Sequence, residues 1–158
     1  MNTAKKSTAY TQNQARKYDK QRFESASGQI IHELERSQLE QAVDMLPRGA
    51  RILEIGAGTA RFSIELAKRG YDVTALDPSA YMIEQGKQKA GNTSNPIFIV
   101  APGEATGLES NSFDLVFSTR VLNRLGTKDL ANAVLMEKFR LVRPGGLIPS
   151  TSQPPVSH

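Results

Sequence analysis

A three-layer α/β/α sandwich around a mostly parallel sheet is the fold that the sequence predicts. Short apolar runs that suit buried strands recur along the chain, segments with helical spacing separate them, and a tight glycine turn joins the first run to the next helix. Strands separated by helices pair in parallel through right-handed crossovers. The 158 residues suffice for one domain of this kind.

Five strands are expected, the last of them short. The runs RILEI, YDVTALD, IFIV and FDLVFS occupy residues 51–55, 71–77, 97–100 and 113–118. IFIV lacks polar alternation and therefore predicts a strand that is buried on both faces. A fifth strand begins at Gly146, but prolines follow it closely, so the sheet is expected to end early.

The spacing of apolar residues predicts helices before and between these strands. They are expected at 30–46, from Phe62 to a stop at Gly70, at 79–90 and at 130–141. Pro78 suits the first turn of the third of these helices, because a proline there removes no helical hydrogen bond.

The positive charge of the chain is concentrated at its N-terminus. Residues 1–22 hold six basic side chains and one acidic side chain, whereas the rest of the sequence is nearly balanced. Since this charge belongs to an arm and not to the body of the domain, no nucleic-acid partner is expected. We expect a basic arm, loosely ordered or serving as a lid, at 1–28, the α/β domain at 29–148 and a tail at 149–158.

Cysteine is absent, which excludes disulfide frameworks, thiol nucleophiles, thiolate zinc sites and iron–sulfur clusters. With one internal histidine, His32, a metal site is not expected, and this residue suits packing better than catalysis. No run reaches the roughly 20 apolar residues of a membrane span, and the N-terminus lacks the apolar middle of a secretory signal. A soluble cytoplasmic protein is therefore expected.

Candidate binding residues follow the ends of the predicted strands. Glu54 and the Gly56–Gly58 turn end the first strand, Asp77 ends the second, Glu104 lies beyond the third, and Ser118 ends the fourth. The carboxyl ends of parallel strands meet at one edge of the sheet, and ligands bind there. The sequence therefore predicts one site that combines these residues.

The glycine turn (Gly56-Ala57-Gly58) favours a cationic ligand over a dinucleotide. Glycines let a ligand approach the backbone, although a tight turn with nothing bound uses them too. A dinucleotide fingerprint needs a third glycine where this chain has Arg61. Glu54 repels a diphosphate but attracts an ammonium or sulfonium group.

Asp77 has two interpretations. It lies 19 residues after Gly58, the spacing at which a carboxylate accepts both hydroxyls of a ribose. It also suits the N-cap of the helix that follows Pro78. One carboxylate can serve both roles with different oxygens.

Four segments carry motifs of a known family. LEIGAGTARFS at 53–63 is similar to its first motif, VTALDPSAYMI at 73–83 to its second, and APGEATGLESNSFDLVFS at 101–118 to its third and fourth. RLVRPGGL at 140–147 is similar to the turn before its fifth strand. In this order they resemble the class I, Rossmann-like S-adenosylmethionine-dependent methyltransferases. The segment YDKQRFESASGQIIHELE resembles the lead-in of the small-molecule subgroup.

The resemblance implies that S-adenosylmethionine is the cofactor and that the first two strand ends bind its methionine and ribose. The methionine part of the cofactor lies against the turn formed by Gly56, Ala57 and Gly58, and Glu54 lies near its ammonium. Asp77 binds the ribose hydroxyls. Tyr10 and Tyr18 on the basic arm are candidates for a lid over the cofactor.

The resemblance implies an adenine site further along the chain. Pro78 and Met82 flank the ring, Glu104 accepts a hydrogen bond from its amino group, and the Ala105 N–H faces a ring nitrogen. The family more often has Asp where Glu104 stands, and an exposed loop acid is the alternative interpretation of that residue. Ser118 completes the implied cofactor-binding set.

The methyl acceptor is expected to contact the stretch after the fourth strand, where the resemblance points to Arg120, Asn123 and Arg124. Two interpretations of Arg120 and Arg124 are open: they bind an acidic group of the substrate, or they are exposed arginines at the end of a helix. Relatives frequently have a histidine near 123 or 124, but this chain has Asn123 and Arg124 there. No catalytic base is therefore assigned. Methyl transfer is an in-line displacement, which needs alignment and exclusion of water more than a base.

Family members continue beyond the fifth strand with further strands that complete the sheet and the acceptor pocket. The resemblance therefore implies a chain truncated after the start of strand five, with an open sheet edge that a homodimer would cover. Three functions stay open: methyl transfer from S-adenosylmethionine to a small molecule, a non-catalytic module that binds S-adenosylmethionine or S-adenosylhomocysteine, and an unrelated α/β nucleotide protein such as a dehydrogenase domain.

Overall fold

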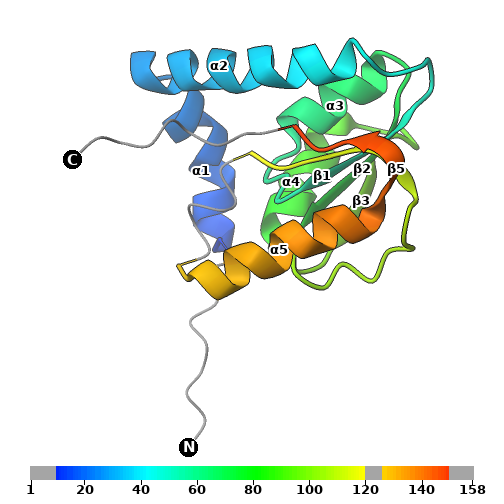
Figure 1. The fold of residues 1–158 in the computed structure, drawn as a ribbon. Helices are drawn as coiled ribbons and strands as arrows, with labels where there is room; N and C mark the ends of the chain where they lie inside the picture. The colour runs from blue at the N-terminus through cyan, green and yellow to red at the C-terminus, as the bar shows by residue number, and fades with distance from the viewer. Residues whose placement is uncertain (1–9, 120–125, 150–158) are drawn as a thin grey trace, which may run out of the picture.

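The sheet consists of five strands that all run parallel (Figure 1). The computed structural model describes residues 10–119 and 126–149. In spatial order the strands are β3 (Ile97–Val100), β2 (Asp72–Asp77), β1 (Arg51–Ile55), β4 (Phe113–Phe117) and β5 (Val142–Leu147). The strand order reverses between β1 and β4, so the carboxyl ends of these two strands border the crevice where sheets of this type bind ligands.

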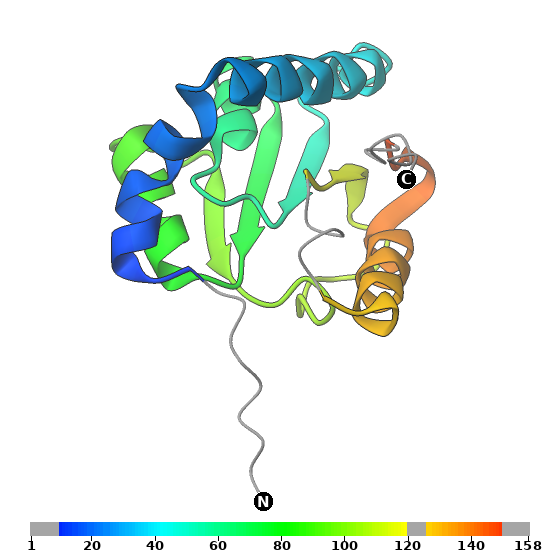
Figure 2. The same cartoon turned by 90° about the vertical axis from the view of Figure 1, so that its left-hand side faces the viewer.

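Helices cover both faces of the sheet (Figure 2). One face carries α2 (Ala26–Val43), α3 (Arg61–Lys68) and α4 (Ala80–Ala90), and the other carries α5 (Lys128–Leu141). The first helix, α1 (Gln12–Phe23), packs against α2 and α4. The predicted three-layer α/β/α sandwich with a parallel sheet is confirmed.

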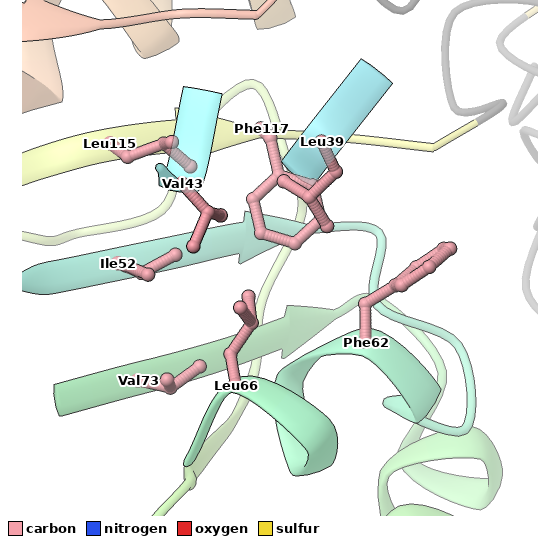
Figure 3. Close-up of a cluster of buried hydrophobic side chains, with 8 residues drawn as sticks. All are labelled: Leu39, Val43, Ile52, Phe62, Leu66, Val73, Leu115 and Phe117. Carbon is pink, nitrogen blue, oxygen red and sulfur yellow. The ribbon is translucent and has the colours of Figure 1, made fainter. Parts of the chain in front are cut away.

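The largest core cluster lies between the sheet and the helices α2 and α3 (Figure 3). Successive residues of β1 point to opposite faces, so Ile52 joins this cluster while Leu53 packs in the cluster under α5. Each fully buried side chain of this size contributes about 1.5–3 kcal/mol to folding. The cluster consists of Leu39, Val43, Ile52, Phe62, Leu66, Val73, Leu115 and Phe117. This packing holds the strand ends in fixed positions.

The strand β3 differs from its prediction. Its apolar sequence predicts burial on both faces, but Ile97 and Val100 are 53% and 52% exposed. β3 is at the edge of the sheet and pairs with β2 alone, and α5 packs over β4 and β5 at the other side. The prediction of two-sided burial is therefore wrong, because an apolar run does not reveal its place in the strand order.

Helix and strand boundaries also differ in places. α2 begins at Ala26, earlier than predicted, because the Ser25 side chain accepts a hydrogen bond from the Gly28 N–H and caps the helix. β5 begins at Val142, directly after α5, and not at Gly146. The segment treated as an arm contains α1, which begins with a capping box between Thr11 and Gln14.

None of the helices in residues 10–119 and 126–149 is both long and apolar enough to cross a membrane.

Candidate functional site

The glycine turn is fastened to the end of β2. The N–H of Ala57 donates to the carbonyl of Leu76 at 2.9 Å, and the N–H of Gly58 donates to Oδ2 of Asp77, also at 2.9 Å. Gly56 and Gly58 have positive φ angles of 71° and 59°, which L side chains rarely adopt. The sequence-predicted residues at the first two strand ends are thus brought together.

Gly58 lies directly beneath two side chains from distant parts of the sequence. A Cβ at this position would meet the Tyr18 ring at 3.7 Å and Cε of Met82 at 3.9 Å. Tyr18 belongs to α1, and Met82 lies in the first turn of α4 and is fully buried. Together with Ala15 they form a small apolar cluster over the glycine turn.

Asp77 is held by backbone donors on two sides. Its Oδ1 accepts from the Ser79 N–H at 2.8 Å, and its Oδ2 accepts from Gly58. Burial raises the pKa of Asp77, and these two donors oppose that effect. The N-cap of α4 is Ser79, whose side chain accepts from the Met82 N–H, so the alternative of Asp77 as the helix cap is wrong.

Glu54 is 1% exposed at the end of β1. Its carboxylate accepts a hydrogen bond from the Ser63 hydroxyl in α3. Burial raises the pKa of Glu54 to about 7, whereas the Ser63 bonds and the charge of Arg22 lower it, and the charge of Asp77 raises it further. A cation close to this carboxylate would therefore be strongly favoured.

Most of the residues implied for adenine are more exposed to solvent than Glu54 and Asp77. Pro78, Glu104 and Ala105 are exposed, and Met82 is buried under α1. The loop that carries Glu104 leaves β3 beside Asp77, because the Ala101 N–H donates to the Asp77 carbonyl at 3.1 Å. The Ala105 N–H donates to the Pro102 carbonyl at 3.2 Å, so a contact with an adenine nitrogen would have to replace that bond.

The end of β4 faces the same side of the sheet. Ser118 and Thr119 are buried there, and Thr119 lines a small cavity with Glu54 and Ala57. Arg120, Asn123 and Arg124 lie outside the described residues. Their predicted role in acceptor binding stays a prediction.

The helix α1 covers the glycine turn, and three polar contacts fasten it there. Asp19 accepts from the Thr59 hydroxyl at 2.6 Å and pairs with the Lys89 ammonium at 2.7 Å. The carbonyl of Tyr10, just before the helix, accepts from the Ser79 hydroxyl at 3.1 Å. Tyr18, a predicted lid residue, thus lies over the site in this structure.

Sequence reasoning missed several polar residues of this region. Arg22, Asp19, Ser63 and Ser79 all contact the strand-end residues or the helix that covers them. Arg22 lies one helical turn after Tyr18, and this i,i+4 spacing is a signal that could have placed both on one face of a helix.

The chemistry of these side chains fits S-adenosylmethionine. A buried carboxylate suits the ammonium of an α-amino acid, and a second carboxylate at the end of β2 suits ribose hydroxyls. Neither Glu54 nor Asp77 pairs with a basic side chain within the described part of the chain. Their charges are therefore available to a ligand.

Comparisons with known proteins identify the family of the chain. A family model described as a methyltransferase domain matches residues 53–149. The chain is 31% identical over 142 residues to the malonyl-[acyl-carrier protein] O-methyltransferase of Enterobacter lignolyticus, which covers 85% of this chain and 54% of that protein. It is 30% identical over 140 residues to the tRNA 5-carboxymethoxyuridine methyltransferase of Escherichia coli, covering 85% and 52%.

A solved structure gives the same result. The TehB-like SAM-dependent methyltransferase of Corynebacterium glutamicum superposes with a TM-score of 0.60 at 27% identity, over 72% of this chain and 59% of that one. Fold and strand-end site together define the class of Rossmann-like S-adenosylmethionine-dependent methyltransferases.

The chain belongs to the methyltransferase-domain family that the motifs predict. The prediction of S-adenosylmethionine as the cofactor of this family is confirmed. The chain spans about half the length of the curated relatives that it matches.

Proposed function

We propose that this chain binds S-adenosylmethionine at the carboxyl ends of β1 and β2 and takes part in transferring its methyl group to a small-molecule acceptor. The observation that carries the proposal is Glu54, a buried carboxylate beside a glycine turn that pairs with no basic side chain in residues 10–119 and 126–149. A buried carboxylate is stabilised by a nearby positive charge, and the ammonium of the cofactor would supply it.

Each strand end has a part in holding the cofactor. Glu54 binds the ammonium, Asp77 binds the ribose hydroxyls, and Met82 and Pro78 flank the adenine, with Glu104 at its amino group. When bound, S-adenosylmethionine supplies an electrophilic methyl group on a positively charged sulfur. The chain aligns donor and acceptor and excludes water, and the apolar cover of Tyr18 over Gly58 serves this exclusion.

The acceptor is proposed to be a small molecule. Outside the N-terminal arm the charges of the sequence nearly balance, which gives little support for a polyanionic acceptor. One relative is named for a substrate on a carrier protein and another for a tRNA base, so members of this family differ in their acceptors. Arg120 and Arg124 make an acidic group the first acceptor feature to test.

Two further parts of the proposal concern setting and assembly. A cytoplasmic location agrees with a sequence that contains no cysteine. A homodimer would cover the outer side of β5, which pairs with β4 alone in the described sheet. Light scattering after size exclusion tests the dimer, and a monomer at all concentrations would contradict it.

The test of the function separates binding from turnover. Calorimetry with S-adenosylmethionine and S-adenosylhomocysteine should show binding of both, and NAD should give no signal. A methyl-release assay then compares a panel of small acids, alcohols and amines with tRNA. Folded protein that gives neither heat nor a thermal shift with either cofactor form would overturn the proposal. Binding without methyl release from any acceptor would reduce it to a binding module, and release with tRNA alone would replace the small-molecule acceptor.

A further inference from the structure

A groove with a basic lining lies between α3 and the end of α4. Its volume is about 440 Å³, and it is lined by Arg61, Ile64, Glu65 and Lys68 of α3 and by Lys89 of α4. The four residues of α3 follow the spacing i, i+3, i+4 and i+7, which places them on one face of that helix. The groove therefore brings three basic side chains and one acidic side chain together beside a buried isoleucine.

The carboxylate in the groove does not neutralise the basic side chains around it. Glu65 forms an ion pair with Arg36, which belongs to α2 and does not line the groove. Within the described part of the chain, Arg61 and Lys68 form no ion pair with a carboxylate. Both side chains are exposed, so their charges are available to an anionic ligand.

Two cations of the groove are held in place by contacts within the protein. The Arg61 guanidinium lies over the Phe23 ring, 4.1 Å from its centroid. The Lys89 ammonium donates to Asp19 at 2.7 Å and to the Thr59 hydroxyl at 3.1 Å. An ammonium has three donors, so Lys89 keeps one for a ligand, and the ring contact of Arg61 leaves its N–H donors free. Side chains that are already positioned lose less conformational entropy when a ligand binds.

We propose that this groove binds a small molecule that carries two or more phosphate groups. Arginine binds a phosphate through two parallel hydrogen bonds, and lysine attracts it as a point charge. Seven residues of α-helix rise about 10 Å, so Arg61 and Lys68 lie two turns apart and favour two separate anionic groups over one. The volume is that of a small-ligand pocket, which favours a small molecule over a nucleic acid.

Arg61 connects this groove to the strand-end region. It also belongs to the lining of the small cavity beside Glu54, so a phosphate bound to Arg61 lies next to the site proposed for the cofactor. The phosphate groove consists of other residues and does not rest on the proposed function. It gives a function to the residue that stands where a dinucleotide fingerprint has its third glycine.

Calorimetry with inorganic pyrophosphate and with fructose 1,6-bisphosphate tests the groove. Neither probe contains a nucleoside, so neither mimics the cofactor at the strand ends. The wild type should bind both more tightly than inorganic phosphate, and added salt should weaken the binding. Arg61→Gln and Lys68→Gln should each weaken it by about two- to fivefold, and the double variant by about five- to twentyfold, because exposed ion pairs are individually weak and distant ones add.

Two further variants separate the groove from the general charge of the surface. Lys87→Gln is the matched control, because Lys87 is an exposed basic residue of α4 that does not line the groove, and it should leave the affinities unchanged. Glu65→Gln removes the carboxylate of the groove and should strengthen binding by about two- to fivefold. Glutamine has nearly the helix propensity of arginine, lysine and glutamate, so these variants should fold, and circular dichroism checks this.

Three results would overturn the proposal. The first is that the folded wild type gives no heat with either probe at low salt. The second is that Lys87→Gln weakens binding as much as Arg61→Gln, which would leave only a general positive surface. The third is that a single-stranded RNA oligomer binds more tightly than both probes and loses affinity in Arg61→Gln and Lys68→Gln, which would assign the groove to nucleic acid. All three measurements are made without S-adenosylmethionine, so they leave the proposed function untouched.

Discussion

Buried ionisable side chains have different surroundings at the ends of β1 and β2 and in the helix α5. At the ends of β1 and β2, Glu54 and Asp77 accept hydrogen bonds from Ser63, Ser79 and Gly58. In the layer on the other face of the sheet, Lys138 of α5 is 2% exposed and forms no hydrogen bond or ion pair within residues 10–119 and 126–149.

The difference is between buried carboxylates whose hydrogen bonds offset part of the cost of burial and a buried ammonium whose burial is not offset in this way. Burial of an ionised group is unfavourable unless it is paired or hydrogen-bonded. The strand-end carboxylates are oriented by donors, as a binding site requires. Lys138 lies between the buried Val134 and Leu141 on the sheet-facing side of α5, and nothing described orients its ammonium.

The largest expected effect comes from Glu54→Gln. Burial holds the pKa of Glu54 at about 7, above its ordinary value of 4.5, so the folded protein becomes less stable as the pH rises from 4.5 to 7. Removing the ionisable group should raise the free energy of unfolding at pH 8 by an amount on the order of 3 kcal/mol, with little change at pH 4. Urea denaturation at both pH values measures this difference.

The exposed Glu33→Gln in α2 is the control for that experiment and should leave stability unchanged at both pH values. The stabilised Glu54→Gln variant should at the same time bind S-adenosylmethionine more weakly. If the difference in the free energy of unfolding between Glu54→Gln and the wild type is the same at pH 4 and at pH 8, the carboxylate of Glu54 is not desolvated in the folded protein.

Asp77→Ala tests the second strand end. It removes the carboxylate that we propose binds the ribose and should weaken S-adenosylmethionine binding by about ten- to a hundredfold, since charge-assisted hydrogen bonds contribute roughly 1.5–3 kcal/mol. Asp72→Ala changes an exposed aspartate at the other end of the same strand and should leave affinity unchanged. Intact folding with unaltered affinity in Asp77→Ala would argue against the ribose assignment.

The strand-end region was largely predictable from the sequence, for a physical reason. Apolar runs that end in Glu54 and Asp77 become parallel strands, and parallel strands bring their carboxyl ends to one edge. The glycines mark the turn because their positive φ angles exclude most other residues. Local sequence therefore determines both the fold of this part and the position of its charges.

The rest depends on contacts between distant segments, which local sequence does not show. α1 is mostly polar and buries only Ala15 and Tyr18, so its apolar pattern does not predict its place over the glycine turn. Arg22 lines the same small cavity as Glu54 only because that helix packs beside the end of β1. The half-exposed β3 shows the same limit, since strand order decides its burial.

Lys138→Met tests the unpaired charge in the α5 layer. Burial lowers the pKa of Lys138 to about 8 from its ordinary 10.5, so the cost to the folded state is full below pH 8 and disappears as the pH rises to 10.5. An apolar side chain of similar length should stabilise the protein by about 1–2 kcal/mol at pH 7, with a smaller gain at pH 10.

Lys128→Met, at the exposed first residue of the same helix, is the matched variant and should not stabilise the protein. Thermal unfolding at pH 7 and pH 10 makes the comparison. Loss of stability in Lys138→Met would mean that the ammonium is satisfied in solution, and the contrast between the two regions would then disappear.

The smallest expected effect is that of Asp19→Asn on the docking of α1. Asp19 joins α1 to Thr59 and Lys89, but it is 38% exposed in its ion pair, and exposed ion pairs contribute only about 0.2–1 kcal/mol. The amide still accepts from the Thr59 hydroxyl, so only the attraction to Lys89 is lost. Hydrogen exchange of the α1 amides should therefore become faster by a small factor, while the amides of β1 and β2 keep their protection.

The control is Asp44→Asn, at the exposed C-cap of α2, which should change the exchange of neither set of amides. Equal acceleration in α1 and in the central strands would show that α1 opens only with the whole domain, and the strand-end site would then have no separately movable cover.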